Sequence, residues 1–246
     1  MNITLLEEVD STNNFLRSLL QKEEVEEGKI VLAHKQTQGK GQRGNSWFSS
    51  PEKNLTFSIL LSPSKLPPVE NFLLSQCVAV GIVEGLSVYV PNLSIKWSND
   101  IYWKNKKLGG ILIENSFRES LWEHSIVGIG LNIFEENFPP DLPNPVSLFQ
   151  ISQKEYSLEE ILEVVFQSIM KNYNLLLSGG KERIQEKYLQ YLYQKGISSE
   201  YEAEGRKFFG TIQGVEPSGK LRMEKENGEI ALYDFKEVKF ITNSRE

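Results

Sequence analysis

The 246-residue sequence contains only one cysteine and two histidines, and these low numbers limit the disulfides and metal sites that it can form. A single cysteine, Cys77, excludes an intramolecular disulfide, which fits a reducing cytoplasm. Cys77 lies within an apolar run, so we expect a small core residue there and not a nucleophile. His34 and His124 have no cysteine neighbours at metal-ligand spacing, which argues against a zinc site.

The sequence also lacks an excess of positive charge and any long apolar run. Its net charge of −6 argues against a general nucleic-acid binder, which would usually carry a basic surface. No apolar run approaches the length that spans a bilayer, and the N-terminus does not have the pattern of a signal peptide. We therefore expect a cytoplasmic protein with neither a membrane nor DNA as its partner. A local basic cleft in an acidic protein would instead draw in a small anionic ligand.

The pattern of apolar and turn residues predicts an α+β main domain over residues 1–194 and an all-β region over residues 195–246. Strands are expected at residues 3–6, 29–33, 54–61, 93–97, 100–104, 109–117 and 125–134. Helices are expected after the capping sequence at residues 10–12, and at residues 69–86, 157–177 and 181–194. Four prolines predict a loop between residues 135 and 150, and regularly placed glycines after Gly196 predict a small antiparallel barrel.

Residues 36–47, Gln-Thr-Gln-Gly-Lys-Gly-Gln-Arg-Gly-Asn-Ser-Trp, form the most informative segment. Its glycines permit left-handed backbone that lines up N–H groups into an anion-binding concavity. Lys40 and Arg43 add charge-assisted hydrogen bonds to phosphate or carboxylate. The spacing matches neither the P-loop nor the dinucleotide fingerprint. Taken alone, the segment fits either an anion-binding loop or a flexible basic hairpin at the surface.

Four other segments combine polar residues with glycine or with the end of a strand. Residues 96–102 place an amide and a carboxylate at a strand end, although an Asn-Asp turn explains them equally well. Residues 106–114 set two cations beside a Gly-Gly step, which would let a ligand approach the backbone or mark a solvated turn. Residues 128–132 interrupt a buried strand with two glycines, and residues 10–13 fit a helix cap. Each segment is weak alone, but their order is specific.

Taken in order, these segments resemble the motifs of biotin protein ligases. The family motifs are Asp-Ser-Thr-Asn, a Gln followed by Gly-Arg-Gly-Arg-x-Gly-x-x-Trp, Lys-Trp-Pro-Asn-Asp, Lys-Leu-x-Gly-Ile-Leu and Gly-x-Gly-x-Asn. They match residues 10–13, 36 with 39–47, 96–100, 107–112 and 128–132. The resemblance covers essentially the whole chain. It implies a central mixed sheet flanked by helices, the class II synthetase-like ligase fold, with a small C-terminal SH3-like β-barrel.

The resemblance also implies an activity and a role for each matching residue. Biotin and ATP would form biotinyl-5′-AMP, and biotin would pass to a lysine of a biotin carboxyl carrier domain. Lys107 would hold the biotin carboxylate beside the α-phosphate, Arg43 would contact phosphate, and Asp100 would lie near Mg²⁺ and the incoming lysine. The residues expected to bind biotin are Ser11, Thr12, Asn13, Gln36, Gly39, Lys40, Gly41, Gln42, Lys107, Gly110, Gly128 and Gly130. Those expected to bind ATP or the adenylate are Lys40, Gln42, Arg43, Asn45, Trp47, Asn99, Lys107 and Asn132.

The sequence departs from the family pattern within the glycine loop. Lys40 stands for an arginine and keeps the charge without its bidentate geometry, whereas Gln42 and Asn45 lose the charge at two cationic positions. We expect looser holding of the adenylate than in members with full arginine loops. No room for a winged helix precedes the first strand, so we expect a ligase without DNA binding.

Two other functions fit parts of the pattern. Lipoate–protein ligases share the catalytic fold and the adenylate chemistry, but they differ in the loop motif. A biotin-binding sensor without transfer activity would fit the altered loop, although Lys107, Asp100 and Asn132 argue against it. The protein is expected to be a monomer or a homodimer.

Overall fold

A seven-stranded sheet forms the centre of the molecule. The structure, a computed structural model, describes residues 1–241 apart from the side chain of Arg43. The strand order is β1-β2-β3-β7-β6-β5-β4. Only β1 and β2 are parallel, which makes the sheet mixed, as expected from the sequence. The strands are β1 (Ile3–Val9), β2 (Ile30–Gln36), β3 (Asn54–Leu61), β4 (Leu93–Lys96), β5 (Asp100–Trp103), β6 (Lys106–Arg118) and β7 (Leu121–Asn132).

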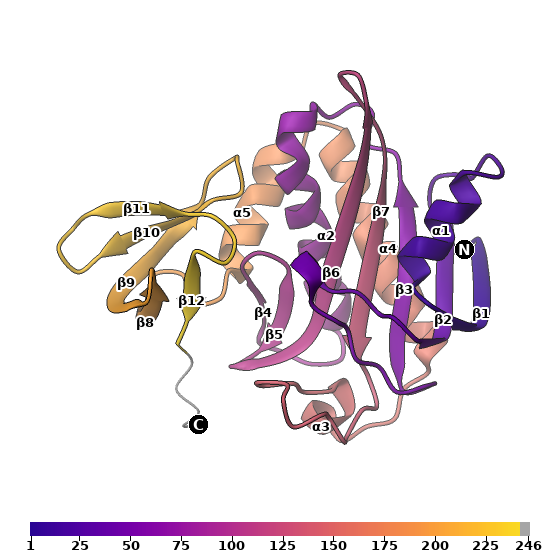
Figure 1. Cartoon of the computed structure of the whole chain (residues 1–246), viewed down its shortest axis with the longest axis horizontal. Coiled ribbons are helices and arrows are strands. Elements are labelled where there is room, and N and C mark those ends of the chain that lie inside the picture. Colours follow the sequence, from indigo (N-terminus) through magenta and orange to yellow (C-terminus); the bar gives the residue numbers. More distant parts are fainter. Residues whose placement is uncertain (242–246) are drawn as a thin grey trace.

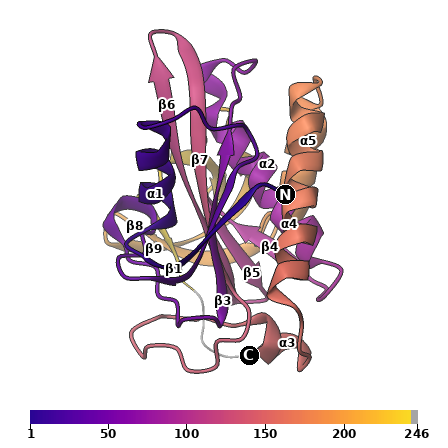
Figure 2. The same cartoon turned by 90° about the vertical axis from the view of Figure 1, so that its right-hand side faces the viewer.

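Helices cover the two faces of this sheet unequally. Three long helices, α2 (Asn71–Leu86), α4 (Leu158–Leu177) and α5 (Lys181–Tyr191), lie on one face. The short helix α1 (Thr12–Leu20) lies on the other, as the view along the sheet shows (Figure 2). The face with a single short helix leaves part of the sheet uncovered by helices.

Strand β3 shows how the sequence assigns residues to the two faces. All eight of its residues are buried, but they alternate in character. Leu55, Phe57 and Ile59 join the large apolar core beneath α2 and α4. Thr56 and Ser58 point the other way because successive side chains of a strand alternate between faces. The uncovered face therefore contains buried hydroxyl groups beside α1.

Helix α2 is the most apolar element of the chain. Together with the 3₁₀ turn that precedes it (Pro68–Glu70), it is long and apolar enough to cross a membrane by length and composition alone. However, 67% of that apolar window is buried within the protein. Cys77 on this helix is fully buried, which confirms its prediction as a core residue, and burial raises the pKa of its thiol.

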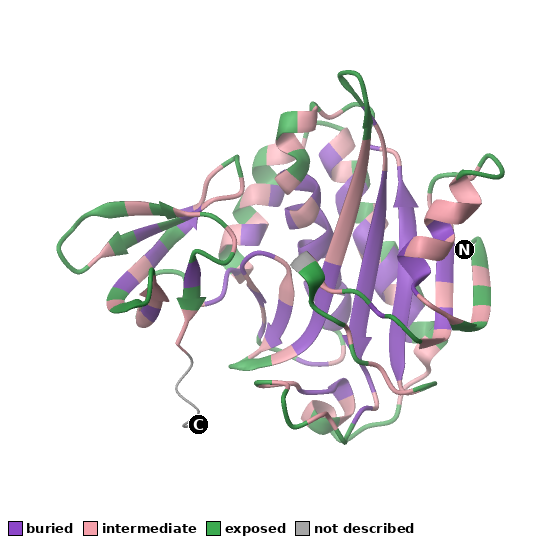
Figure 3. Cartoon of the chain, in the orientation of Figure 1, coloured by how far each residue is buried: buried purple, intermediate pink, exposed green. Residues whose placement is uncertain are grey.

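The last part of the described chain forms a second, antiparallel sheet beside β4 (Figure 1). Its order is β11-β10-β9-β8-β12, so among the described residues no pairing of β11 with β12 closes it into a barrel. The strands are β8 (Ser198–Ala203), β9 (Arg206–Val215), β10 (Leu221–Lys225), β11 (Ile230–Tyr233) and β12 (Val238–Phe240). Residues 242–246 of the predicted C-terminal region lie outside the described residues. This sheet is more exposed than the central one (Figure 3).

The structure corrects the predicted elements in two places. A short helix, α3 (Leu148–Ser152), begins within the predicted loop, where Ser147 and Gln150 form a capping box. Helix α5 ends at Tyr191, three residues before the predicted end at 194. The other predicted helices and strands are present, with ends shifted by a few residues.

Candidate active site

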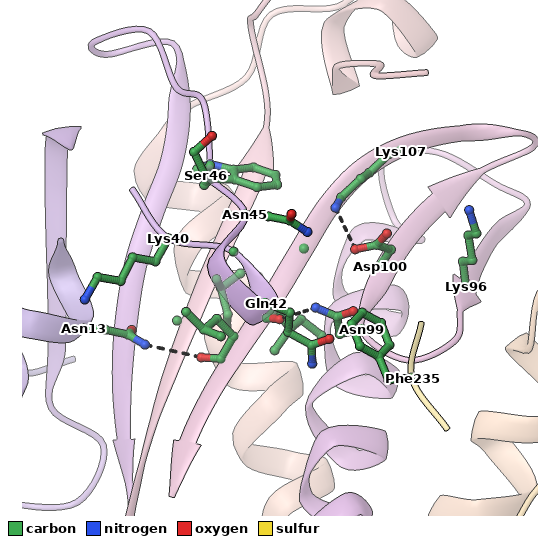
Figure 4. Close-up of a pocket in the computed structure, with 18 of the residues that line it drawn as sticks. Asn13, Lys40, Gln42, Asn45, Ser46, Lys96, Asn99, Asp100, Lys107 and Phe235 are labelled. Atoms are coloured by element: carbon green, nitrogen blue, oxygen red, sulfur yellow. Dashed lines mark hydrogen bonds and ion pairs between the residues drawn. The ribbon is translucent and has the colours of Figure 1, made fainter. Parts of the chain in front are cut away.

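A cleft of about 550 Å³ lies on the sheet face that the three long helices leave uncovered. Most of the residues predicted to bind a ligand line it. They are Ser11, Thr12, Asn13, Gln36, Lys40, Gly41, Gln42, Asn45, Trp47, Asn99, Asp100, Lys107, Gly110, Gly128 and Gly130. Figure 4 shows Asn13 and Lys40 at one end and Lys96 at the other, with Gln42, Asn45, Lys107 and Asp100 between them.

Glycines flatten the floor of the cleft. In β6 and β7, Gly110 and Gly130 are paired directly across the strands. Their neighbours Ile111 and Ile129 point into the core on the opposite face. A Cβ atom at Gly130 would lie 2.3 Å from the Trp47 ring, and one at Gly128 would lie 2.5 Å from Asn13 Oδ1. These positions therefore exclude side chains so that other groups can approach the backbone.

Lys107 and Asp100 form an ion pair on the cleft wall, with 2.7 Å between Nζ and Oδ1 (Figure 4). The backbone of Lys107 is fixed because its N–H donates to Asn144 O at 2.7 Å and its C=O accepts from Val146 N at 2.9 Å. Its Nζ also lies 5.6 Å from the centroid of the Trp47 ring. The wall of the cleft therefore carries a cation with a fixed backbone and one carboxylate partner.

The glycine loop forms a hairpin that is closed by backbone hydrogen bonds. Lys40 and Ser46 form an antiparallel bridge, and Gly41 N–H donates to Asn45 O at 2.7 Å. A 3₁₀ turn (Gln42–Gly44) closes the hairpin, with Gly44 at a φ of +85°. Gly44 thus supplies the left-handed conformation that other residues adopt at a cost. The predicted phosphate contact Arg43 lies in this turn, but its side chain is outside the described part of the structure.

Trp47 extends from the end of this hairpin over the glycine floor. Its ring lies against Gly130 and Gly110. Its Nε1 is buried and has no hydrogen-bond partner within the described part of the chain. A buried donor without an acceptor is costly, so this N–H favours a ligand that brings an acceptor.

The N-terminus of α1 is hydrogen-bonded to a strand distant in the sequence, and this corrects the predicted helix cap. Ser11 occupies the N-cap position of α1, but its side chain makes no capping hydrogen bond. Instead, Thr12 N–H donates to Gln36 Oε1 at 2.8 Å. Gln36 on β2 therefore satisfies a free donor of the first turn, which a capping side chain would otherwise do.

Two predicted residues do not line the cleft. Gly39 is buried in the hairpin, where a Cβ atom would lie 2.5 Å from Trp47 O. Asn132 donates to the carbonyl oxygens of Val146 at 3.2 Å and Lys107 at 3.4 Å. Asn99 does line the cleft, and it donates to Ile111 O at 2.6 Å. Asn132 thus supports the backbone around Lys107 from outside the cleft.

The structure adds residues that sequence reasoning missed. Lys96 lines the cleft beside residues from the second sheet, which are Phe235, Lys236, Val238, Lys239 and Phe240. Lys96 Nζ lies 3.1 Å from Tyr102 Oη and 4.9 Å from the centroid of the Phe240 ring. Lys96 belongs to a recognised motif, but the cations of the second sheet carry no local signal. Only the fold brings them to the cleft.

The mixed sheet, its glycine floor and the lysine–aspartate pair define an α+β domain with a cleft lined by both cations and neutral polar groups. Helix, hairpin and second sheet each contribute to the walls of its cleft. The chain belongs to the biotin/lipoate A/B protein ligase family, whose model matches residues 5–132.

Two curated proteins are similar to this chain over most of its length. The bifunctional ligase/repressor BirA of Bacillus spizizenii is 30% identical over 213 residues, which are 84% of this chain and 65% of the relative. The biotin–protein ligase of Homo sapiens is 26% identical over 245 residues, or 93% of this chain and 32% of the relative. The chain thus spans 65% or less of the length of these curated relatives.

A solved structure resembles the chain over nearly its full length. The biotin protein ligase from Aquifex aeolicus, in complex with biotin and ATP, matches with a TM-score of 0.80 at 26% identity. The match covers 98% of this chain and 99% of that chain. Both sheets of the present structure therefore fall within the match.

Proposed function

We propose that the protein activates biotin with ATP to give biotinyl-5′-AMP and pyrophosphate, and then transfers biotin to one lysine of a biotin carboxyl carrier domain. The observation that carries this proposal is the Lys107–Asp100 pair, 2.7 Å apart, on the wall of a glycine-floored cleft. The similarity to a ligase structure with biotin and ATP supports it.

The cleft offers separate environments for the two substrates. At the α1 end, neutral hydroxyl and amide groups of Thr12, Asn13 and Gln36 suit the ureido ring of biotin. At the other end, Lys96 and Lys239 suit a triphosphate. Lys107 lies between these two ends, where the biotin carboxylate and the α-phosphate must meet.

The first step requires two anions to approach each other. A carboxylate oxygen attacks the α-phosphorus, the bond from phosphorus to the bridging oxygen breaks, and pyrophosphate leaves. The Lys107 ammonium offsets the repulsion between carboxylate and phosphate. In the second step, the carrier lysine amine attacks the acyl carbonyl and AMP leaves, and in this proposal Asp100 would accept the proton that the amine loses. Positioning and charge compensation account for the rate, and no covalent nucleophile of the protein is needed.

The residues of the cleft fit a Mg²⁺ ion that arrives with ATP. The described residues contain no group of three or more His, Cys, Asp or Glu side chains that would hold a metal alone. Mg²⁺ usually keeps several waters and binds one or two carboxylates together with substrate phosphates. Asp100, with Asn99 beside it, supplies such a carboxylate. When bound, the ion neutralises charge on the triphosphate.

Pyrophosphate release from Mg-ATP tests the proposal, with and without biotin and with and without a carrier domain. We expect release that requires biotin and turns over only with carrier. Lys107→Ala should lower the rate by about 100-fold or more, because it removes a charge that stabilises the transition state. Lys106→Ala is the matched control, since Lys106 is exposed and does not line the cleft.

Other outcomes would identify other functions. Tight biotin binding without pyrophosphate release would indicate a sensor. Release that depends on lipoate and not on biotin would indicate a lipoate–protein ligase, which the same family model includes. A normal rate in Lys107→Ala would show that Lys107 does not have the proposed role.

The proposal also includes a protein partner and a cellular location. A carrier domain is the macromolecular partner that the reaction requires. One cysteine, buried in the core, is consistent with a cytoplasmic location.

A further inference from the structure

Side chains at the α1 end of the cleft form one continuous hydrogen-bond chain. Arg17 pairs with Glu114 at 2.6 Å, and Glu114 Oε2 accepts from Asn13 Nδ2 at 2.7 Å. Asn13 Oδ1 lies 2.6 Å from Ser58 Oγ, which lies 2.7 Å from Thr12 Oγ1. We call the series Glu114, Asn13, Ser58 and Thr12 the Glu114 relay.

Glu114 and the Leu112 carbonyl together fix the direction of the bonds in the Glu114 relay, since Asn13 Nδ2 donates to Glu114 Oε2 at 2.7 Å and to Leu112 O at 3.4 Å. A carboxylate only accepts hydrogen bonds, so the amide nitrogen of Asn13 must face Glu114. The amide oxygen of Asn13 therefore faces Ser58 and takes its single hydroxyl hydrogen. Ser58 has no second hydrogen for Thr12, so the Thr12 hydroxyl hydrogen is directed to Ser58 Oγ at 2.7 Å, with Gln36 Oε1 as a second, longer acceptor at 3.2 Å.

Thr12 is left with lone pairs and no hydrogen to offer. Water cannot readily reverse this arrangement, because Ser58 is fully buried and both Asn13 and Thr12 are 3% exposed. The neighbouring Gln36 has the opposite polarity. Its oxygen accepts the Thr12 N–H at 2.8 Å, so its nitrogen is the end that remains to donate. This end of the cleft thus offers an acceptor beside a donor.

We propose that Ser58 and Glu114 are positioning residues that set the hydrogen-bond polarity of Thr12, so that the cleft selects ligands presenting an N–H at this point. The inference rests on the proposed function, since the ureido ring of biotin supplies such an N–H next to a carbonyl oxygen. Neither positioning residue touches the ligand. Each acts through Thr12.

Two substitutions break the Glu114 relay in different ways. Ser58→Ala removes the nearer acceptor of the Thr12 hydroxyl and leaves only the longer bond to Gln36 Oε1 at 3.2 Å, so the hydroxyl can turn to donate to a ligand in the cleft. Glu114→Gln permits reversal, because a glutamine amide can donate to the oxygen of Asn13 and only the longer bond to Leu112 O, at 3.4 Å, opposes it. The Asn13 nitrogen would then donate to Ser58, Ser58 to Thr12, and Thr12 to the ligand.

Calorimetric titration tests the proposal with biotin and two cyclic carbamate analogues, each carrying a ring oxygen in place of one ureido N–H. The analogue whose oxygen faces Thr12 should bind the wild-type protein about 100-fold more weakly than biotin, because two acceptors would then face each other. In Ser58→Ala and Glu114→Gln this ratio should fall by about 10-fold or more. The other analogue identifies which ureido nitrogen faces Thr12.

Matched controls separate polarity from packing. Ser18→Ala removes a hydroxyl of α1 that donates to Phe15 O at 3.0 Å, outside the Glu114 relay. Glu123→Gln neutralises a carboxylate that pairs with Arg118 at 2.7 Å. Both controls should keep the wild-type ratio. If Ser58→Ala and Glu114→Gln weaken biotin and analogue by the same factor, the two residues are merely structural and the proposal is overturned.

A second measurement does not depend on biotin. In the unliganded protein, the Thr12 hydroxyl proton should exchange slowly and show a nuclear Overhauser effect to Ser58, and both signs should vanish in Ser58→Ala. A rapidly exchanging Thr12 hydroxyl in the wild-type protein would overturn the Glu114 relay. Failure of biotin to bind the wild-type protein would instead overturn the proposed function.

Discussion

The ammonium group of Lys96 is partly shielded from water by two aromatic rings. Its Nζ lies 4.8 Å from the centroid of the Tyr102 ring and 4.9 Å from that of Phe240. Burial lowers the pKa of Lys96 because the charged form loses hydration, and the charge of Asp100 opposes this change only in part. A triphosphate in the cleft would supply the missing negative charge, so we expect ATP binding to favour protonated Lys96.

This setting predicts a pH dependence of ATP binding. The charged form exists below the lowered pKa, so ATP affinity should be highest at pH values below it. It should decline as the pH rises, starting below the range of an ordinary lysine. Lys96→Arg stays charged and should move the decline to higher pH. Lys96→Met should weaken ATP binding by about 10-fold without changing the biotin Kd.

Titrations of ATP and of biotin between neutral and alkaline pH measure both effects. Lys106→Met is the control, since it removes an exposed lysine outside the cleft. Equal pH profiles for the wild-type protein and Lys96→Arg would exclude a role of this lysine in binding the triphosphate.

At the scale of elements, the glycine hairpin connects two walls of the cleft. Lys40 Nζ donates to Asn14 Oδ1 at 2.8 Å, which attaches the hairpin to α1. Gln42 Oε1 accepts from Ser98 Oγ at 3.3 Å, which attaches it to the connection between β4 and β5. At Gln42, a position where the family pattern has charge, the hairpin is thus held by a neutral contact.

Adding charge at Gln42 should strengthen retention of the adenylate. We expect Gln42→Arg to slow adenylate release by about 10-fold, because a guanidinium binds phosphate bidentately. Gln38→Arg makes the same change at an exposed position outside the cleft and should have no effect. Chasing preformed adenylate with excess unlabelled biotin measures the rate. The prediction fails if Gln42→Arg releases adenylate at the wild-type rate. Separately, if the wild-type protein releases adenylate as slowly as relatives with a full arginine loop, the expectation that it holds the adenylate more loosely is wrong.

Elements with local signals could be predicted from the sequence, and contacts between distant segments could not. Strand β3 was predicted at residues 54–61 and found at Asn54–Leu61, because a continuous β-prone run needs no distant partner to be recognised. The cap of α1 was predicted from the capping sequence at residues 10–12, whereas Gln36, 24 residues from Thr12, accepts the hydrogen bond of the Thr12 N–H. Likewise, α3 was missed because four prolines dominate the segment before it.

At the scale of the whole molecule, two sheets share one cleft. Trp97 Nε1 donates to Gly219 O at 2.9 Å, which links the loop after β4 to the second sheet. Tyr193 N–H donates to Ile95 O at 2.9 Å at the same junction. Since Phe240 and Lys239 line the cleft from the second sheet, its position relative to β4 sets the shape of the triphosphate end.

Loosening this junction should weaken ATP binding while sparing biotin. Trp97→Phe keeps an aromatic ring but removes the bond to Gly219 O, at a cost of about 1 kcal/mol. We expect faster hydrogen exchange in β10 to β12 and an ATP Kd raised by about 3- to 10-fold. The biotin Kd should stay unchanged, because Thr12 and Gln36 belong to α1 and the central sheet. Trp103→Phe, on the neighbouring strand β5, is the matched control because Trp103 does not line the cleft. Equal weakening of ATP and biotin in Trp97→Phe would show instead that the two ends of the cleft respond as one unit.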